Sequence, residues 1–191
     1  MDRKVLAVVL AAGASRRFGS PKQLALVGNL TLVEHIQTVL LGSSVDEVSV
    51  VVGSSAEAIE PYILPGAKVW HNEQWDEGIA ASIRCAAQYA AETQASHLFL
   101  FACDQPFVTP CLVDKIVNLS KFDPDKIIAC KYGDSVGVPA LFPNNYFELL
   151  RSLRGDSGAK SIIKKAAGTV FVEFPQGVTD VDYPSDLPLQ I

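Results

Sequence analysis

The most constraining feature of this sequence is a repeated alternation of short apolar runs with segments of helical spacing. The runs at residues 4–10 (KVLAVVL), 47–52 and 97–102 (HLFLFA) lack a regular exchange of polar and apolar residues, which is typical of strands buried on both faces. Residues 31–41 and 78–92 place apolar side chains three and four positions apart, which predicts helices. This alternation predicts an α/β fold, a mostly parallel, Rossmann-like sheet flanked by helices.

The other predicted elements continue the pattern to the end of the chain. Strands are expected at 67–70, 126–130, 138–142 and 169–174, and helices at 110–119, 144–150 and 157–167. Ligands of such sheets bind beyond the carboxyl ends of the strands. The residues that directly follow each strand are therefore where chemistry is expected.

Length and composition narrow the class of protein. With 191 residues, 49% of them hydrophobic, the chain is expected to form one domain, residues 1–191, with its own core. The longest apolar run, residues 5–14, is short of the roughly 20 residues that span a bilayer, so no membrane association is expected. The formal net charge of −5 disfavours nucleic acid as a partner. Four cysteines without metal-binding spacing indicate free thiols in a cytoplasmic protein.

The loop after the first strand is the strongest candidate for a binding site. It reads LAAGASRRFGSPKQL from residue 10 to residue 24. Gly13 and its small neighbours let backbone N–H groups approach a ligand, Ser15 offers a hydroxyl, and Arg16 and Lys22 flank a second arginine. Backbone donors together with three cations favour a polyphosphate. The loop is neither G-x-x-x-x-G-K-[ST] nor G-x-G-x-x-G, which disfavours a P-loop and a dinucleotide oxidoreductase.

An aspartate follows the buried strand at 97–102 directly. Asp104 lies in the segment FACDQP, at the strand end where a ligand is expected. A carboxylate beside a polyphosphate is unfavourable unless a divalent cation lies between them, and Mg²⁺ takes one or two carboxylates together with phosphate oxygens and water. Asp104 is thus either a metal ligand or the cap of a turn before Pro106.

These motifs resemble those of a known family. The pattern L-x-x-G-x-S-x-R-[FM]-G-x-x-K after an N-terminal strand resembles the signature of nucleotidyltransferases with a Rossmann-like fold. The similarity is greatest to the MocA-type molybdenum cofactor cytidylyltransferases, relatives of the MobA-type guanylyltransferases, and runs along nearly the whole chain. The nucleotide-binding residues that this resemblance implies are Leu10, Ala11, Ala12, Gly13, Ser15, Arg16, Lys22, Asn72, Gly78, Ser82 and Asp104.

The resemblance also implies a catalytic metal site. Asp104 matches a metal ligand of the family, and the segment TDVDYPSDL resembles D-[IV]-D-T-P-E-D-L, whose second aspartate maps onto Asp182 and completes a Mg²⁺ site. Asp180 is expected on the same side of this extended segment, and Asp186 at a helix start. The catalytic residues implied are Arg16, Lys22, Asp104 and Asp182.

Three further segments match motifs of the family. In HNEQWDEGIAASIR (71–84), Gly78 and Ser82 fall at a helix start that can meet an anion or ribose, and Asn72 and Trp75 position the loop. The segments GVPALF (137–142) and LRGDSGAK (153–160) are expected to face the second substrate or to be simple turns, with Asp156 capping the next helix. The residues implied on this acceptor side are Gly137, Pro139, Gly155, Asp156 and Lys160.

The reaction that the resemblance implies is nucleotidyl transfer. A phosphate of the acceptor attacks the α-phosphorus of a nucleoside triphosphate, and pyrophosphate leaves; an ionised phosphate needs no general base, so the protein aligns groups and neutralises charge. Ala12 stands where guanylyltransferases carry glycine, and its methyl group would crowd a purine. CTP and molybdopterin are the expected substrates, and a molybdenum hydroxylase is the expected client of the cytosine dinucleotide product.

Three alternatives remain open at this stage. The chain could be a molybdopterin guanylyltransferase, or it could transfer a nucleotidyl group to a sugar or polyol phosphate. It could also be a cofactor-carrying protein without catalysis, although Asp104, Asp182, Arg16 and Lys22 together exceed what binding alone requires. Release of pyrophosphate separates the transferases from the carrier.

Overall fold

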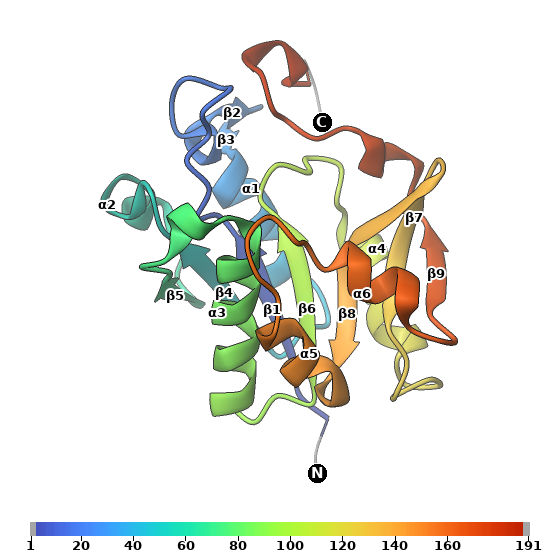
Figure 1. Ribbon diagram of the computed structural model, residues 1–191. Coiled ribbons are helices and arrows are strands. Elements are labelled where there is room, and N and C mark those ends of the chain that lie inside the picture. Colours follow the sequence, from blue (N-terminus) through green and yellow to red (C-terminus); the bar gives the residue numbers. More distant parts are fainter. Residues whose placement is uncertain (1–2, 189–191) are drawn as a thin grey trace.

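The computed structural model describes residues 3–188, and a seven-stranded sheet forms its centre (Figure 1). The strand order is β5-β4-β1-β6-β8-β7-β9. All neighbours pair in parallel except β8, which is antiparallel to both β6 and β7. The strands are β1 (Val5–Leu10), β4 (Glu47–Val52), β5 (Ala67–His71), β6 (His97–Ala102), β7 (Ile128–Tyr132), β8 (Ser135–Pro143) and β9 (Val170–Glu173). The predicted fold class, a mostly parallel sheet between helices, is confirmed.

Helices cover both faces of the sheet. They are α1 (Leu32–Leu41), α2 (Ala56–Ile59), α3 (Ile79–Glu92), α4 (Pro110–Leu119), α5 (Phe147–Arg151) and α6 (Lys160–Lys165). The apolar sides of α1 and α4 pack on one face, and those of α3, α5 and α6 on the other (Figure 1). Within residues 3–188, no helix combines the length and the apolar character needed to cross a membrane.

Two helices, α1 and α4, begin at a threonine whose side chain caps the first turn. Thr31 caps α1 by accepting from the Glu34 amide at 3.3 Å, while the Glu34 carboxylate accepts from the Thr31 amide at 2.9 Å, a reciprocal capping box. The Thr109 side chain caps α4 by accepting from the Leu112 amide at 3.3 Å, and Pro110 occupies the first turn. The predicted boundaries of these two helices, and of α3, are confirmed to within one residue.

Strand β6 shows why the buried strands lack polar alternation. Phe99 and Phe101 point to one face of the sheet, with their rings 4.3 Å apart between centroids, and Leu98 and Leu100 point to the other. All four side chains are fully buried. Because helices cover both faces, every position of the strand requires an apolar residue.

Several elements differ from the sequence prediction. A small hairpin of β2 (Leu26–Val27) and β3 (Leu30–Thr31) was not predicted, because two-residue strands show no periodicity. The predicted helix at 144–150 is divided into a 3₁₀ turn and α5, and the one predicted at 157–167 begins only at Lys160. The antiparallel direction of β8 follows from the two-residue turn between β7 and β8, which is far too short for a parallel crossover.

We expect the Phe99→Ala substitution to lower the free energy of unfolding by about 3–5 kcal/mol, because it removes a buried ring and leaves a cavity. Phe122 is the matched control, since its side chain is 83% exposed and its replacement by alanine should cost no more than about 0.5 kcal/mol. Urea unfolding followed by tryptophan fluorescence measures both values. Similar losses in the two variants would contradict the packing described.

Candidate active site

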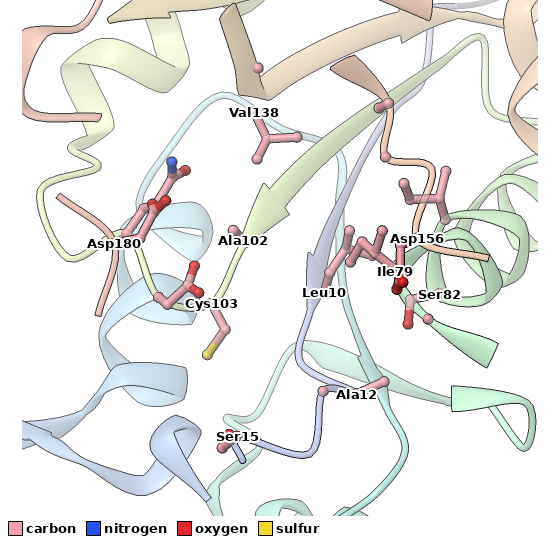
Figure 2. Close-up of a pocket in the computed structure, with 18 of the residues that line it drawn as sticks. Leu10, Ala12, Ser15, Ile79, Ser82, Ala102, Cys103, Val138, Asp156 and Asp180 are labelled. Atoms are coloured by element: carbon pink, nitrogen blue, oxygen red, sulfur yellow. The ribbon is translucent and has the colours of Figure 1, made fainter. Parts of the chain in front are cut away.

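A cavity of about 610 Å³ opens at the carboxyl edge of the sheet. Its walls come from the ends of β1 and β6, the beginning of β8, the first turn of α3 and the loop before α6 (Figure 2). The predicted site residues that line it are Leu10, Ala12, Gly13, Ser15, Arg16, Lys22, Gly78, Ser82, Asp104, Gly137, Asp156 and Lys160. The other predicted residues, Ala11, Asn72, Pro139, Gly155 and Asp182, lie behind or beside this lining.

A buried glutamine shapes the loop after β1. The side chain of Gln23 is 2% exposed, and its amide nitrogen donates to the carbonyl oxygens of Ala11 and Gly13, each at 2.9 Å. Its amide oxygen accepts from the Ser15 hydroxyl at 3.1 Å. These bonds turn the carbonyl oxygens toward Gln23, and the amides of residues 13–16 have no partner within the described part of the chain. The loop is therefore a set of backbone donors suited to an anion.

Lys22 joins the two predicted metal ligands. Its ammonium nitrogen donates to Asp104 at 2.5 Å and to Asp182 at 3.0 Å. Burial by itself lowers the pKa of Lys22, but the two carboxylates outweigh this effect and raise it above its ordinary value. The hydrogen bond from Lys22 holds the pKa of Asp182 below its usual range. Lys22 and Asp182 are therefore charged near neutral pH.

The two arginines of the loop have different partners. Arg17 donates to the second carboxylate oxygen of Asp182 at 2.6 Å, a contact that the sequence did not predict. Arg16 lines the cavity and forms no ion pair with any residue that the structure describes. Arg16 is thus available to a ligand, whereas Arg17 already neutralises an aspartate.

The carboxylates fit a divalent cation that arrives with phosphate. Asp104 and Asp182 approach the same ammonium nitrogen, so their oxygens surround one point in space. Over residues 3–188, no three His, Cys, Asp or Glu side chains are grouped to hold a metal ion by themselves. Two carboxylates are what Mg²⁺ takes when phosphate oxygens and water supply its other ligands. This donor set agrees with the expectation from the family resemblance.

A third carboxylate stands on the side of β8. Asp180 lines the cavity, and burial, with the nearby charge of Asp104, raises its pKa. Burial and the proximity of Asp180 raise the pKa of Tyr132 to about 12, so this phenol is neutral. The backbone amide of Val181 donates to the carbonyl oxygen of Asp104 at 3.0 Å and fixes the C-terminal segment beside β6. Tyr132 and Gln105, which also line this wall, were not predicted, since neither belongs to a charged motif.

The first turn of α3 carries the hydroxyl that the sequence predicted. Asn72 is 6% exposed, and its amide nitrogen donates to the Ser82 hydroxyl oxygen at 3.1 Å. The Asn72 amide oxygen accepts from the Gln74 backbone at 3.0 Å. Asn72 therefore positions Ser82.

The loop of residues 153–158 is fastened to this end of α3. The Arg84 guanidinium binds Glu77 at 2.5 Å and the carbonyl oxygen of Leu153 at 3.0 Å, and Glu77 accepts from the Gly155 amide at 3.2 Å. These bonds to Arg84 and Gly155 lower the pKa of Glu77 to about 2. The carboxylate thus stays charged, and the contact stays formed, at any pH well above 2.

One expectation for Asp156 needs correction. It does not cap α6, which begins at Lys160 after Ala159 without a side-chain cap, because the preceding loop is fastened to α3 instead. Asp156 lies at the wall of the cavity that α3 forms. Figure 2 shows Asp156 beside Ser82 and Ile79, across the cavity from Asp180. A Cβ atom on Gly78 would lie 2.5 Å from an Asp156 oxygen, so the two residues are in contact.

A donor-lined loop, free and paired cations, and two convergent carboxylates at the edge of a Rossmann-like sheet define the site of a nucleotidyltransferase. The chain belongs to the family of the MobA-like NTP transferase domain, whose family model matches residues 7–170. The enzyme class and the family expected from the sequence are therefore confirmed.

Three curated relatives illustrate the range of this family. The chain is 28% identical to nicotine blue oxidoreductase of Paenarthrobacter nicotinovorans, over 84% of the chain and 82% of the relative. It is also 28% identical to purine catabolism protein PucB of Bacillus subtilis, over 95% and 93%. A putative molybdenum cofactor guanylyltransferase of Neisseria meningitidis is 29% identical over 63% of the chain and 62% of that relative.

Solved structures of similar proteins share this fold, and one of them was solved in complex with a divalent metal. The crystal structure of Rv0371c from Mycobacterium tuberculosis superimposes with a TM-score of 0.82 at 28% identity, covering 97% of this chain and 96% of that one. A second structure of Rv0371c was solved in complex with manganese, with a TM-score of 0.77 at 27% identity over 96% and 95% of the two chains. The presence of manganese in that complex is consistent with the paired carboxylates.

We expect the Gly78→Ala substitution to release the loop of residues 153–158 from α3. Gly78 has φ +116°, and a new Cβ would lie 2.7 Å from the Gly155 carbonyl oxygen, so the loop must move. Gly28→Ala is the matched control, because Gly28 also has a positive φ, +62°, but has nothing within 4 Å of the added atom. Hydrogen exchange measured by mass spectrometry should accelerate in residues 153–158 in the first variant only. Unchanged exchange there would argue against the contact.

Proposed function

We propose that this protein transfers CMP from CTP to the terminal phosphate of molybdopterin and releases pyrophosphate. The observation that carries the proposal is the approach of Asp104 and Asp182 to one point beside the donor-lined loop, with Lys22 between them. Lys22, Asp104 and Asp182 belong to three motifs that lie far from one another in the sequence. Their convergence supports a centre for phosphoryl chemistry more strongly than any one motif.

The residues of the loop would hold the triphosphate. Backbone amides of residues 13–16 and the unpaired Arg16 face the cavity and can donate to phosphate oxygens. Lys22 would exchange its carboxylate partners for phosphate oxygens and stabilise the negative charge of the leaving pyrophosphate. Gly13, with nothing within 4 Å of its missing Cβ, leaves room for a phosphate at the loop.

Asp104 and Asp182 would hold Mg²⁺, with Arg17 keeping Asp182 in place. When bound, the cation neutralises charge on the phosphates. The protein aligns acceptor and α-phosphate so that an already ionised phosphate oxygen can attack, and no side chain has to remove a proton. Asp180 and Tyr132 remain on the acceptor side of this centre.

The proposed choice of CTP depends on the narrow base end of the cavity. Ala12 is almost fully buried, and its Cβ would lie 2.8 Å from a Cβ on Gly53, while Trp75 approaches the same glycine. The wall behind Ala12 is therefore filled and cannot retreat from a purine. A pyrimidine fits this end with less displacement.

The proposed acceptor follows the family. The Neisseria relative is named for guanylyl transfer to the molybdenum cofactor, and we extend this class of acceptor, and a molybdenum hydroxylase as client of the product, to the present chain. All four cysteines are free thiols, which supports a location in the reducing cytoplasm. Lys160, whose ammonium group donates to Ser135 at 2.6 Å, lines the cavity beside β8 and would bind an acceptor phosphate there.

We expect Asp104→Asn to reduce turnover by about 10²–10³-fold or more, because it removes one charge from the centre that neutralises the phosphates. Asp134→Asn is the matched control: this exposed residue lies in the turn between β7 and β8 and does not line the cavity. Turnover is measured as pyrophosphate release, with folding checked by circular dichroism. Near-normal turnover of a folded Asp104→Asn variant would refute the assigned role.

Pyrophosphate release with Mg²⁺ and each of CTP, GTP, ATP and UTP, with and without molybdopterin, tests the proposed substrates. We expect release with CTP that depends on molybdopterin. A preference for GTP would identify a guanylyltransferase, and activity only with sugar or polyol phosphates would replace the acceptor. Nucleotide binding without release would favour the carrier, and a redox reaction with nicotine blue would point to the activity for which one relative is named.

A further inference from the structure

The end of the cavity farthest from Asp180 combines two polar side chains with two apolar ones. Ser82 and Asp156 lie there together, beside Leu10 and Ile79 (Figure 2). Ser15 and Cys103 lie elsewhere on the lining, toward the loop and β6. A nucleotide whose phosphates occupy the loop would place its base, rather than its phosphates, against the apolar side chains of this corner.

The position of Asp156 is determined by its neighbours. Gly155, directly before it, donates its amide to Glu77 and accepts from the Ala80 amide at 3.1 Å through its carbonyl oxygen. Arg84 holds Glu77 from the other side, and Gly78 lacks the Cβ that would displace the Asp156 carboxylate. These contacts hold Asp156 at the first turn of α3, although the contacting residues Glu77 and Gly155 are 78 positions apart in the sequence.

The hydrogen bonds of Asn72 also determine which group of this corner can donate to a ligand and which can accept. The Asn72 amide oxygen accepts from the Gln74 backbone, so its nitrogen must be the atom that faces Ser82. Ser82 accepts that bond, and its own hydrogen is free to donate into the cavity. The Asp156 carboxylate can only accept, and it has no hydrogen-bond partner among residues 3–188. The corner therefore offers one donor beside one acceptor.

We propose that Asp156 accepts a hydrogen bond from the 4-amino group of cytosine, with Ser82 donating to the neighbouring ring acceptor, and that this pair selects CTP against UTP. The inference rests on the proposed function and deepens it. Cytosine presents an amino donor at position 4, where uracil presents a carbonyl oxygen. That oxygen would face the carboxylate, and two acceptors repel each other. The crowded wall at Ala12 limits ring size, and Asp156 then distinguishes between the two pyrimidines.

The test is a calorimetric titration of the full-length protein with CTP and with UTP, in the presence of Mg²⁺ and without acceptor. We expect wild-type protein to prefer CTP by about tenfold or more, the effect of one hydrogen bond to a charged group. Asp156→Asn should lose about tenfold of this preference, because an amide can donate to the uracil oxygen. Asp134→Asn, an equal loss of charge outside the cavity, should retain the wild-type preference.

The possible outcomes separate this inference from the proposed function. Equal weakening of CTP and UTP in Asp156→Asn would indicate a contact to ribose and would overturn the inference. An unchanged CTP preference in that variant would overturn it as well, with the cytidylyltransferase left standing. A preference of the wild-type protein for GTP in the pyrophosphate-release assay would instead overturn the proposed choice of CTP, and the inference with it.

Discussion

Burial of the central sheet on both faces is the constraint from which the rest of this structure follows. Strands such as β1 and β6 have no surface on which a charged side chain could be hydrated, so charge is confined to the points where the strands end. In the parallel half of the sheet these points share one edge. The polyphosphate loop after β1 and Asp104 after β6 become neighbours for this reason alone, although 82 residues separate Lys22 from Asp104.

At the carboxyl edge of the sheet, pairing of opposite charges then determines how the side chains are arranged. Three acidic residues approach one another near β6, and such a group would be unstable without cations. Lys22 and Arg17 supply the balance in the free protein, whereas Arg16 forms no ion pair among residues 3–188. A metal–nucleotide complex can replace these internal ion pairs, because its phosphates can take the place of the carboxylates at Lys22 and its metal can take the place of Lys22 at the carboxylates.

Much of the fold and part of the site could be predicted from the sequence. The strands β1, β4 and β6 and the helices α1, α3 and α4 carry their own periodicity and caps, and Lys22, Asp104 and Asp182 stand in motifs with a clear electrostatic purpose. Asn72 and Ser82 were expected together and are hydrogen bonded.

The remaining features depend on contacts that local sequence does not encode. Nothing in the local sequence distinguishes Gln23 from other polar residues, and its role appears only when the loop is folded around it. Asp156 was expected to cap α6. The Glu77–Arg84 pair that holds its loop at α3 instead can be seen only in the three-dimensional structure. The direction of β8 was likewise decided by the length of one turn. For Asp156 the deciding partner, Glu77, lies far along the chain.

The reversed direction of β8 has a consequence for how such enzymes diversify. Its first residues, not its last, stand at the cavity, so this wall of the cavity is attached to a surface hairpin whose tip is Gly133 and Asp134. Insertions at a hairpin tip cost little stability, and here they would lengthen that wall without disturbing β1, β6 or the carboxylates. This part of the cavity can therefore vary between enzymes with this fold while the loop after β1 and the carboxylates stay the same.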